Sequence, residues 1–305
     1  MFAQAVSGLI AYGVLQMRGI GGLAGWQWLF IIEGVFTILV GILFTALCPR
    51  STSNPTCLIG IRYFDERESQ ILTRRVVLDD PTKHHLHKNI TGAEIKRTLL
   101  NWRLYPHVIF TIAGLAPSST MWSYAPTLVN SFGYERLRSN ALVSIGQWIQ
   151  LVINISWGFL ADRLGQRGPL VFLGMLLWWV FALSCRLLIY SNDSRKRFAL
   201  LTLAISFGSI WHPVNGSWMA LNAHTAGERS ITLAIFIMSA NCSGIVGSQL
   251  FQQGDKPLYR VGWTVIVALV SLALFFTIWA NVQYRLLNRR LRSRGLLNEK
   301  TRYRY

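Results

Sequence analysis

Long apolar runs separated by short polar gaps dominate the pattern of side chains along the chain. An α-helix needs about 20 residues to cross roughly 30 Å of hydrocarbon, and eight runs approach or exceed that length. The pattern therefore predicts an all-α, polytopic transmembrane helix bundle with spans at residues 2–17, 26–47, 104–127, 139–160, 170–190, 197–222, 231–251 and 262–282.

One long gap, residues 48–103, carries helical patterns of its own. Phe64, Ile71 and Leu78 fall on one helical face, with acidic residues in the first turn as the helix dipole favours. Asp79-Asp80-Pro81 ends this helix because the residue before a proline disfavours the α region. Thr91 and Glu94 form a capping box that starts a second helix. We expect amphipathic helices here rather than a separate domain.

Composition agrees with a membrane protein. The chain is 52% hydrophobic and 14% charged, against about 25% charged for a soluble domain. The formal charge of +17 does not indicate nucleic-acid binding, because the basic residues lie in the gaps between apolar runs. Alternate gaps lie on opposite sides of the membrane, and 21 of the 30 Lys and Arg residues fall on one side. The positive-inside rule makes that side cytoplasmic, with both chain ends there.

The segment 158–167, between two apolar runs, reads GFLADRLGQR. This G-x-L-A-D-R-x-G-x-R spacing resembles the loop signature of the major facilitator superfamily of secondary transporters. The resemblance implies two six-helix halves, a long cytoplasmic loop between them, and a substrate site at their interface that works by alternating access. We expect a multi-pass protein of the plasma membrane, with the vacuolar membrane as the alternative.

Matched to that family, the chain resembles a partial major facilitator fold. Residues 1–47 correspond to the last two helices of the N-terminal half, 48–103 to the inter-half loop, 104–282 to the six-helix C-terminal half, and 283–305 to a basic cytoplasmic tail. Roughly four leading helices of the family are absent from the match. A truncated, non-transporting membrane protein or a gene-model fragment is therefore an alternative to an active transporter.

A finer resemblance is to the fungal anion:cation symporters of the allantoate-permease-like group. It rests on three stretches: 25–34 (GWQWLFIIEG), 64–68 (FDERE) with the later DDP at 79–81, and 255–259 (DKPLY). At 223–230 the chain has AHTAGERS where the group commonly has Gly-His-Thr-Lys-Arg. The resemblance implies proton-coupled symport of a small organic or sulfur-containing anion, such as allantoate, a vitamin or a nicotinate-like acid. The residues themselves provide no Lys or Arg deep within a span to bind an anion.

The charged loop is the first candidate for function. We expect the Asp162 carboxylate to accept hydrogen bonds from Arg167 and from a neighbouring helix end, forming with Arg163 a latch that closes the cytoplasmic side. Gly158 and Gly165 would permit close packing and a tight turn. The alternative is a static topological loop.

Two spans carry candidate cavity residues. In 139–160, Ser144, Gln147, Gln150 and Asn154 form one polar stripe, which faces either the substrate cavity or another helix. In 197–222, Pro213 cannot donate to the carbonyl of Ser209, so the helix is expected to kink or open beside His212 and Asn215. Broken helices with polar residues mark transporter binding sites, and His212 is also a possible proton site. A tolerated kink with a satisfied histidine is the alternative.

The remaining candidates stand alone. Trp122 and Tyr124 would line the cavity as aromatic residues, and Asn241 would reach it from beside a small-residue face. Glu33, a carboxylate within a span, is a second possible proton site, with a structural partner as the alternative.

No Ser/His/Asp set, metal-ligand spacing or phosphate-binding glycine loop is found in the sequence. We therefore expect no enzyme activity, no catalytic residue, no metal and no cofactor. The expected partners are a small anionic solute, the coupling proton and the lipid bilayer, with no nucleic acid.

Overall fold

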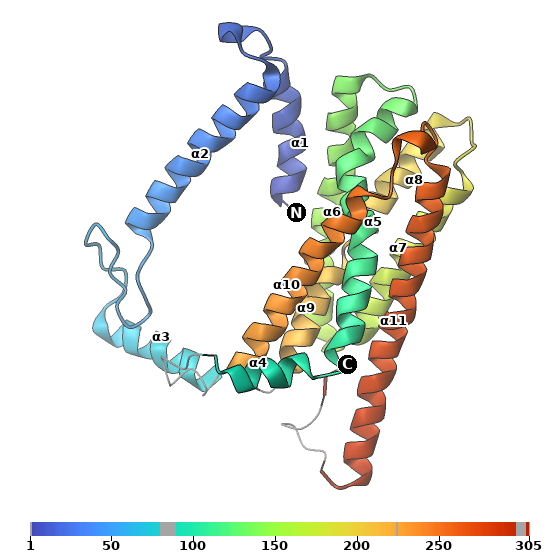
Figure 1. Cartoon of the computed structure of the whole chain (residues 1–305). Helices are drawn as coiled ribbons and strands as arrows, with labels where there is room; N and C mark the ends of the chain where they lie inside the picture. Colours follow the sequence, from blue (N-terminus) through green and yellow to red (C-terminus); the bar gives the residue numbers. More distant parts are fainter. Residues whose placement is uncertain (1, 80–89, 224, 297–302, 305) are drawn as a thin grey trace. The chain divides into compact units, whose positions relative to one another are not determined.

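A computed structural model describes residues 2–79, 90–223, 225–296 and 303–304 (Figure 1). The chain forms two compact units, one of residues 10–90 and one of residues 1–9 together with 91–305. Named regular elements in the described residues are all helical, and the first helix, α1 (Phe2–Leu15), contributes to both units. The all-α fold predicted from the sequence is confirmed.

The unit of residues 10–90 contains a short 3-10 turn, η1 (Ile20–Gly22), followed by α2 (Gly25–Leu47) and α3 (Glu66–Asp79). Almost every side chain of α2 is exposed, although the helix is strongly apolar. An apolar helix of this length suits a lipid environment. In α3 the Glu68 carboxylate accepts from the backbone N–H of Asp65 at 2.9 Å, which caps the first turn. The helix is described as far as Asp79, and the rest of the stop predicted at Asp79-Asp80-Pro81 falls on residues 80–89, which lie outside the described part.

The other unit begins with α4 (Gly92–Leu99), whose capping box forms as predicted. Glu94 accepts from the backbone N–H of Thr91 at 3.0 Å, and Thr91 Oγ1 accepts from the backbone N–H of Glu94 at 3.3 Å. A helical bundle follows, made of α5 (Leu104–Ser131), α6 (Arg136–Leu164), α7 (Arg167–Leu187), α8 (Ser194–Phe207), α9 (Trp211–Leu221), α10 (Ala226–Ser248) and α11 (Arg260–Ser293), with η3 (Gln253–Asp255) before α11.

Within this bundle, α5 packs against α10 and α11, and α11 also packs along α7 (Figure 1). The α6 helix packs against α8, and α9 lies between α7 and α10. The core contains large aromatic side chains, and glycines make room for them. A Cβ atom added at Gly114 would lie 2.7 Å from Cζ2 of Trp211, which is fully buried. Many large apolar side chains, among them Ile155 and Phe159, instead face outward, as expected of helices that meet lipid.

Six described helical stretches are long and apolar enough to cross a membrane: Gly25–Leu47, Arg136–Leu164, Arg167–Leu187, Ser194–Leu221, Ala226–Ser248 and Arg260–Ser293. The two other predicted spans form α1 and α5, which are helical but fall outside that set. In α1 the helix is only 14 residues long. The α5 helix has 28 residues, but prolines and small polar residues dilute its apolar character.

The α11 helix continues past the predicted start of the tail at residue 283 and ends at Ser293. The last apolar turns pass directly into an arginine-rich helical extension, which hydropathy alone does not distinguish from a tail. Gly295, at φ 67°, ends the helix in the left-handed conformation. Its N–H donates to Arg292 O at 3.0 Å and that of Leu296 to Leu291 O at 2.9 Å, the Schellman arrangement that reverses the chain.

Candidate functional site

The most distinctive backbone feature of the bundle is the break between α8 and α9. The α8 helix ends at Phe207 and α9 starts at Trp211, so the regular helical hydrogen bonding of the predicted span 197–222 is interrupted over residues 208–210, although Gly208 and Ile210 keep right-handed helical dihedrals. Pro213 is the third residue of α9. Its missing N–H is therefore not needed, since the first four N–H groups of a helix lack an internal partner. Of the kink or opening predicted from Pro213, the structure has an interruption of the hydrogen-bond pattern around Ser209, one turn closer to the N-terminus than the proline itself, with α-helical dihedrals at Gly208 and Ile210.

Side chains from two other helices donate hydrogen bonds to residues at the interruption between α8 and α9. Gln150 of α6 donates from Nε2 to Ile205 O and to Ser209 Oγ, both at 2.9 Å. Ser118 of α5 donates to Gly208 O at 2.8 Å. Gln150 is only 1% exposed. The sequence left two roles open for Gln150, facing the substrate cavity or facing another helix. Its contacts are those of an interhelical hydrogen bond, and they hold residues 205–209 against α6.

The rest of the polar stripe on α6 has unused hydrogen-bonding capacity. Ser144 is buried and donates to Ala141 O of its own helix at 2.6 Å, and Asn154 donates to Gln150 O at 2.9 Å. Among the described residues, the buried side-chain oxygens of Gln147, Gln150 and Asn154 have no hydrogen-bond partner. Buried acceptors of this kind are uncommon, so three along one helix make this stripe able to accept further hydrogen bonds.

The two candidates in α9 lie in different surroundings. His212 is partly buried and stacks on the Phe236 ring of α10 at 4.4 Å between centroids, and its Nδ1 has no partner within the described residues. Asn215 is fully buried. It pairs with His107 Nδ1 at 2.7 Å and donates to Thr111 Oγ1 at 3.1 Å, both on α5. His212 therefore keeps an unused ring nitrogen, whereas Asn215 belongs to a satisfied polar network in the core.

The sequence reading assigned His107 no role in this network. Its Nε2 lies 3.3 Å from the Tyr284 hydroxyl of α11, so one imidazole links α5, α9 and α11. The available signal was a histidine near the start of an otherwise apolar run. Its partners, 108 and 177 residues away in the chain, had no pattern that pointed to it.

The charged loop between α6 and α7 forms the expected ion pair. Arg167 Nη2 lies 2.8 Å from Asp162 Oδ1, and Arg167 Nε donates to Ser217 Oγ of α9 at 2.8 Å. The Arg167 side chain is 15% exposed and that of Asp162 is 76% exposed. Arginine thus joins the loop to the helix that follows the break. Ser217 was not predicted, because nothing in its local sequence distinguishes it.

The two loop glycines differ. Gly165 caps α6 at φ 64°, the left-handed conformation that makes the predicted tight turn. A Cβ atom added at Gly158 would meet nothing within 4 Å among the described residues, so the close packing predicted there is absent from this part of the chain. Close packing occurs instead at Gly168, where an added Cβ would lie 2.3 Å from Asn281 Oδ1. Arg163 is exposed.

The remaining candidates do not join these groups. Trp122 is partly buried, and Tyr124 packs edge-on against Phe251 at 5.6 Å between ring centroids. Asn241 is exposed on α10. Glu33, which lies in the other unit, is exposed on α2, and no hydrogen bond to its carboxylate is present among the described residues.

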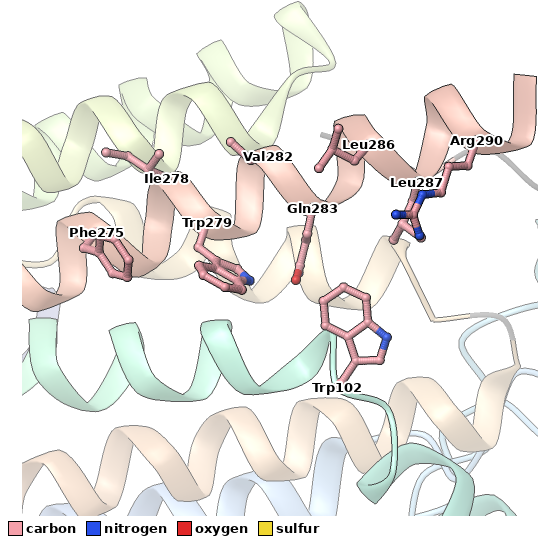
Figure 2. Close-up of a pocket in the computed structure, with 9 residues that line it drawn as sticks. All are labelled: Trp102, Phe275, Ile278, Trp279, Val282, Gln283, Leu286, Leu287 and Arg290. Atoms are coloured by element: carbon pink, nitrogen blue, oxygen red, sulfur yellow. The ribbon is translucent and has the colours of Figure 1, made fainter. Parts of the chain in front are cut away.

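A separate groove of about 360 Å³ runs along α11 and contains none of the predicted site residues (Figure 2). Its walls are largely apolar and include Trp102, Phe275, Trp279 and Leu286, with Gln283 near the middle and Arg290 at one end. An open apolar groove on the outside of a transmembrane bundle suits a lipid chain, so we do not assign a solute to it.

Comparison with known proteins agrees with this architecture. Residues 2–248 match the family described as the Major Facilitator Superfamily. An uncharacterized transporter of Saccharomyces cerevisiae is 28% identical over 287 residues, covering 92% of this chain and 53% of the yeast protein. An uncharacterized transporter of Schizosaccharomyces pombe is 22% identical over 278 residues (88% and 52%), and the MFS-type transporter cnsO of Penicillium expansum is 21% identical over 305 residues (97% and 57%).

The chain spans about half the length of these relatives. The family match nevertheless extends from α1 through α10 and includes the charged loop, the polar stripe and the broken helix. This protein belongs to the Major Facilitator Superfamily.

Proposed function

We propose that the protein is a secondary transporter that carries a small organic anion together with a proton by alternating access. The observation that carries this proposal is the interruption between α8 and α9, bridged by Gln150 from a helix with unsatisfied acceptors, within a family of transporters. Discontinuous helices are where transporters of many folds bind solutes. Membership of this family also argues for transport rather than enzymatic chemistry.

The finer assignment is to the fungal anion:cation symporters of the allantoate-permease-like group. It is supported by the three stretches at 25–34, 64–68 and 255–259. The unpartnered oxygens of Gln147, Gln150 and Asn154 fit the N–H groups of a ureide or of an amide-bearing acid. They do not fit its carboxylate, for which the described spans offer no Arg or Lys near mid-span.

Trp122, Tyr124, Asn215 and Asn241 remain proposed as further cavity residues. Of these, Asn215 acts through His107 and Thr111 rather than by direct exposure to a solute. For the coupling proton we propose His212 first, because its free Nδ1 lies just beyond the break. Glu33 is the second candidate.

The pair Asp162–Arg167 is proposed as a gate. Arg167 also binds Ser217 in α9, so a rigid-body movement of α9 below the break would have to break that contact. Charge-assisted bonds of this geometry stabilise the conformation in which they form, and the other conformation becomes accessible when they break. In this proposal the loop, like both ends of the chain, faces the cytoplasm, and the membrane is the plasma membrane.

Uptake measured in proteoliposomes tests the proposal. The protein expressed from its native transcript should accumulate a ureide or a nicotinate-like acid when an inward proton gradient is imposed. Variants His212→Ala and Gln147→Leu should lower that rate at least tenfold, whereas Gln249→Ala, an exposed change at the end of α10, should leave it unchanged. Equal uptake by all four proteins would contradict the assignment of the site.

A further inference from the structure

Two residues near the C-terminus, Tyr303 and Arg304, lie against the end of the bundle where α5 begins and where α9 and α11 end. We call this the basic end, because it carries Arg103, Arg167 and the arginines of the last turns of α11. The Schellman turn at Gly295 reverses the chain just beyond α11. Contact between residues 303–304 and the bundle is therefore compatible with the way the helix ends.

The contact is made mainly to the backbone of these two residues. Asn288 of α11 donates from Nδ2 to Tyr303 O at 2.8 Å and accepts from the Tyr303 N–H at 2.9 Å. Asn222, directly after α9, accepts from the Arg304 N–H at 2.9 Å and donates to Arg304 O at 3.1 Å. Each asparagine amide thus satisfies both backbone groups of one residue, as a neighbouring strand would.

A tryptophan strengthens the second of these contacts. Trp218 Nε1 donates to Arg304 O at 2.9 Å, so this carbonyl accepts two hydrogen bonds from the end of α9. The Arg304 side chain itself is exposed. Recognition at this position therefore depends on the backbone and not on the identity of the side chain.

The Tyr303 side chain is recognised separately. Its hydroxyl accepts from Arg103 Nη1, the Arg103 guanidinium lies 4.8 Å from the ring centroid, and the Tyr284 ring packs at 5.7 Å. Gln283 of α11 holds Arg103 by donating to its carbonyl at 3.1 Å. An aromatic ring with a hydroxyl fits this position, which adds sequence preference to the backbone contacts.

We propose that Asn222 and Asn288 form a clamp for an extended peptide backbone, with the chain's own Tyr303–Arg304 as its ligand, and that docking restrains α9 relative to α11. Arg167 binds Ser217 in the same helix, so the clamp and the charged loop restrain α9 together. The restraint on transport rests on the proposed function, whereas the docking does not. The tail in this account is a regulatory segment that slows opening of the basic end.

Hydrogen exchange of the purified full chain tests the docking without any transport. We expect the backbone amides of Tyr303 and Arg304 to exchange at least tenfold more slowly than in a synthetic peptide of residues 300–305. Arg304→Pro removes the N–H that binds Asn222 and alters no residue of the helical bundle. It should return the Tyr303 amide to within about twofold of the free-peptide rate.

Matched controls separate the clamp from general destabilisation. Arg304→Ala keeps the backbone groups and should exchange like the wild type. Asn222→Leu and Asn288→Leu should each release the tail, whereas Asn130→Leu, at the opposite end of α5, should not. Wild-type amides that exchange at the free-peptide rate would overturn the proposal, as would an Arg304→Pro chain that stays protected.

Transport rates then test the regulatory half. Arg304→Pro should raise the initial uptake rate at least twofold over Arg304→Ala in the same proteoliposomes. Equal rates with a docked wild-type tail would refute the regulatory role. If the wild type carries no tested solute, the proposed function fails while the exchange result on docking still stands.

Discussion

Replacing Gln150 with leucine should destabilise the bundle, because this side chain closes the α8–α9 break. Leucine has a similar volume, so the main loss is the pair of hydrogen bonds to Ile205 O and Ser209 Oγ. Interhelical hydrogen bonds in membrane proteins average about 0.6 kcal/mol and reach about 1.7 kcal/mol. A buried acceptor left without a partner costs about 1–3 kcal/mol. Ile205 O does not become such an acceptor, because the Gly208 N–H also donates to it at 3.4 Å, so we expect the loss of the two side-chain bonds alone, about 1–2 kcal/mol in total.

The assay is thermal unfolding of the purified protein in detergent, followed by loss of helical circular dichroism. A change of 1 kcal/mol shifts the melting temperature of a domain of this size class by about 2–4 °C, so Gln150→Leu should lower it by roughly 2–8 °C. Gln147→Leu, one turn earlier on α6, is the matched control. The buried Gln147 oxygen has no partner among the described residues, and its removal should be neutral or stabilising.

Equal melting temperatures for the wild type and Gln150→Leu would refute the view that this glutamine supports the break. An equal loss in both glutamine variants would refute it as well, because the stripe would then contribute through polarity rather than through two defined bonds.

Three further variants test particular contacts. Gly168→Ala places a Cβ atom 2.3 Å from Asn281 Oδ1 and 2.9 Å from the Trp218 ring, and should lower the unfolding free energy by about 1–3 kcal/mol in thermal unfolding. The double variant Gly168→Ala, Asn281→Ala should lose less than the sum of the two single variants, and strictly additive losses would contradict the packing at this site. Pro213→Ala should change the free energy of unfolding by less than about 1 kcal/mol, because the first turn of α9 does not need the added N–H. An increase in that free energy of about 3 kcal/mol would mean that Pro213 interrupts a continuous helix. Asp162→Asn should change the unfolding free energy by less than about 1 kcal/mol, since Asp162 is 76% exposed, and a larger loss in a denaturant titration would show that the ion pair is stronger than its exposure implies.

Apolar run length predicted most of the fold correctly. Eight helical regions appear at the eight predicted positions, and the capping box at Thr91 and the left-handed turn at Gly165 form as their residues require. These features are local, so a single stretch of sequence determines them. The apolar run predicted a span only to residue 282, whereas α11 runs on to Ser293, because a helix can leave the bilayer without any break in its backbone pattern.

The candidate site was predicted only where its chemistry is local. The loop pair Asp162–Arg167 lies five residues apart and was expected from the motif. Ser217, the second partner of Arg167, comes from a helix 50 residues away, and the asparagines that bind the tail are 66 positions apart. Long-range partners are set by helix packing, and no periodicity in one sequence identifies them. Helix packing also gives Gln150 contacts that differ from those of Ser144, Gln147 and Asn154, although the sequence alone does not distinguish the four polar residues of the stripe.

Proton flux driven by a solute is the most direct measurement of the central claim. The protein expressed from its native transcript would be reconstituted in vesicles that contain a pH-sensitive dye, and allantoate, nicotinate-like acids and vitamins would be added outside in turn. We predict that at least one of these acids acidifies the vesicle interior and that His212→Ala abolishes the signal. If none of them moves protons while a known symporter does so in the same vesicles, this protein is not a proton-coupled carrier of these acids.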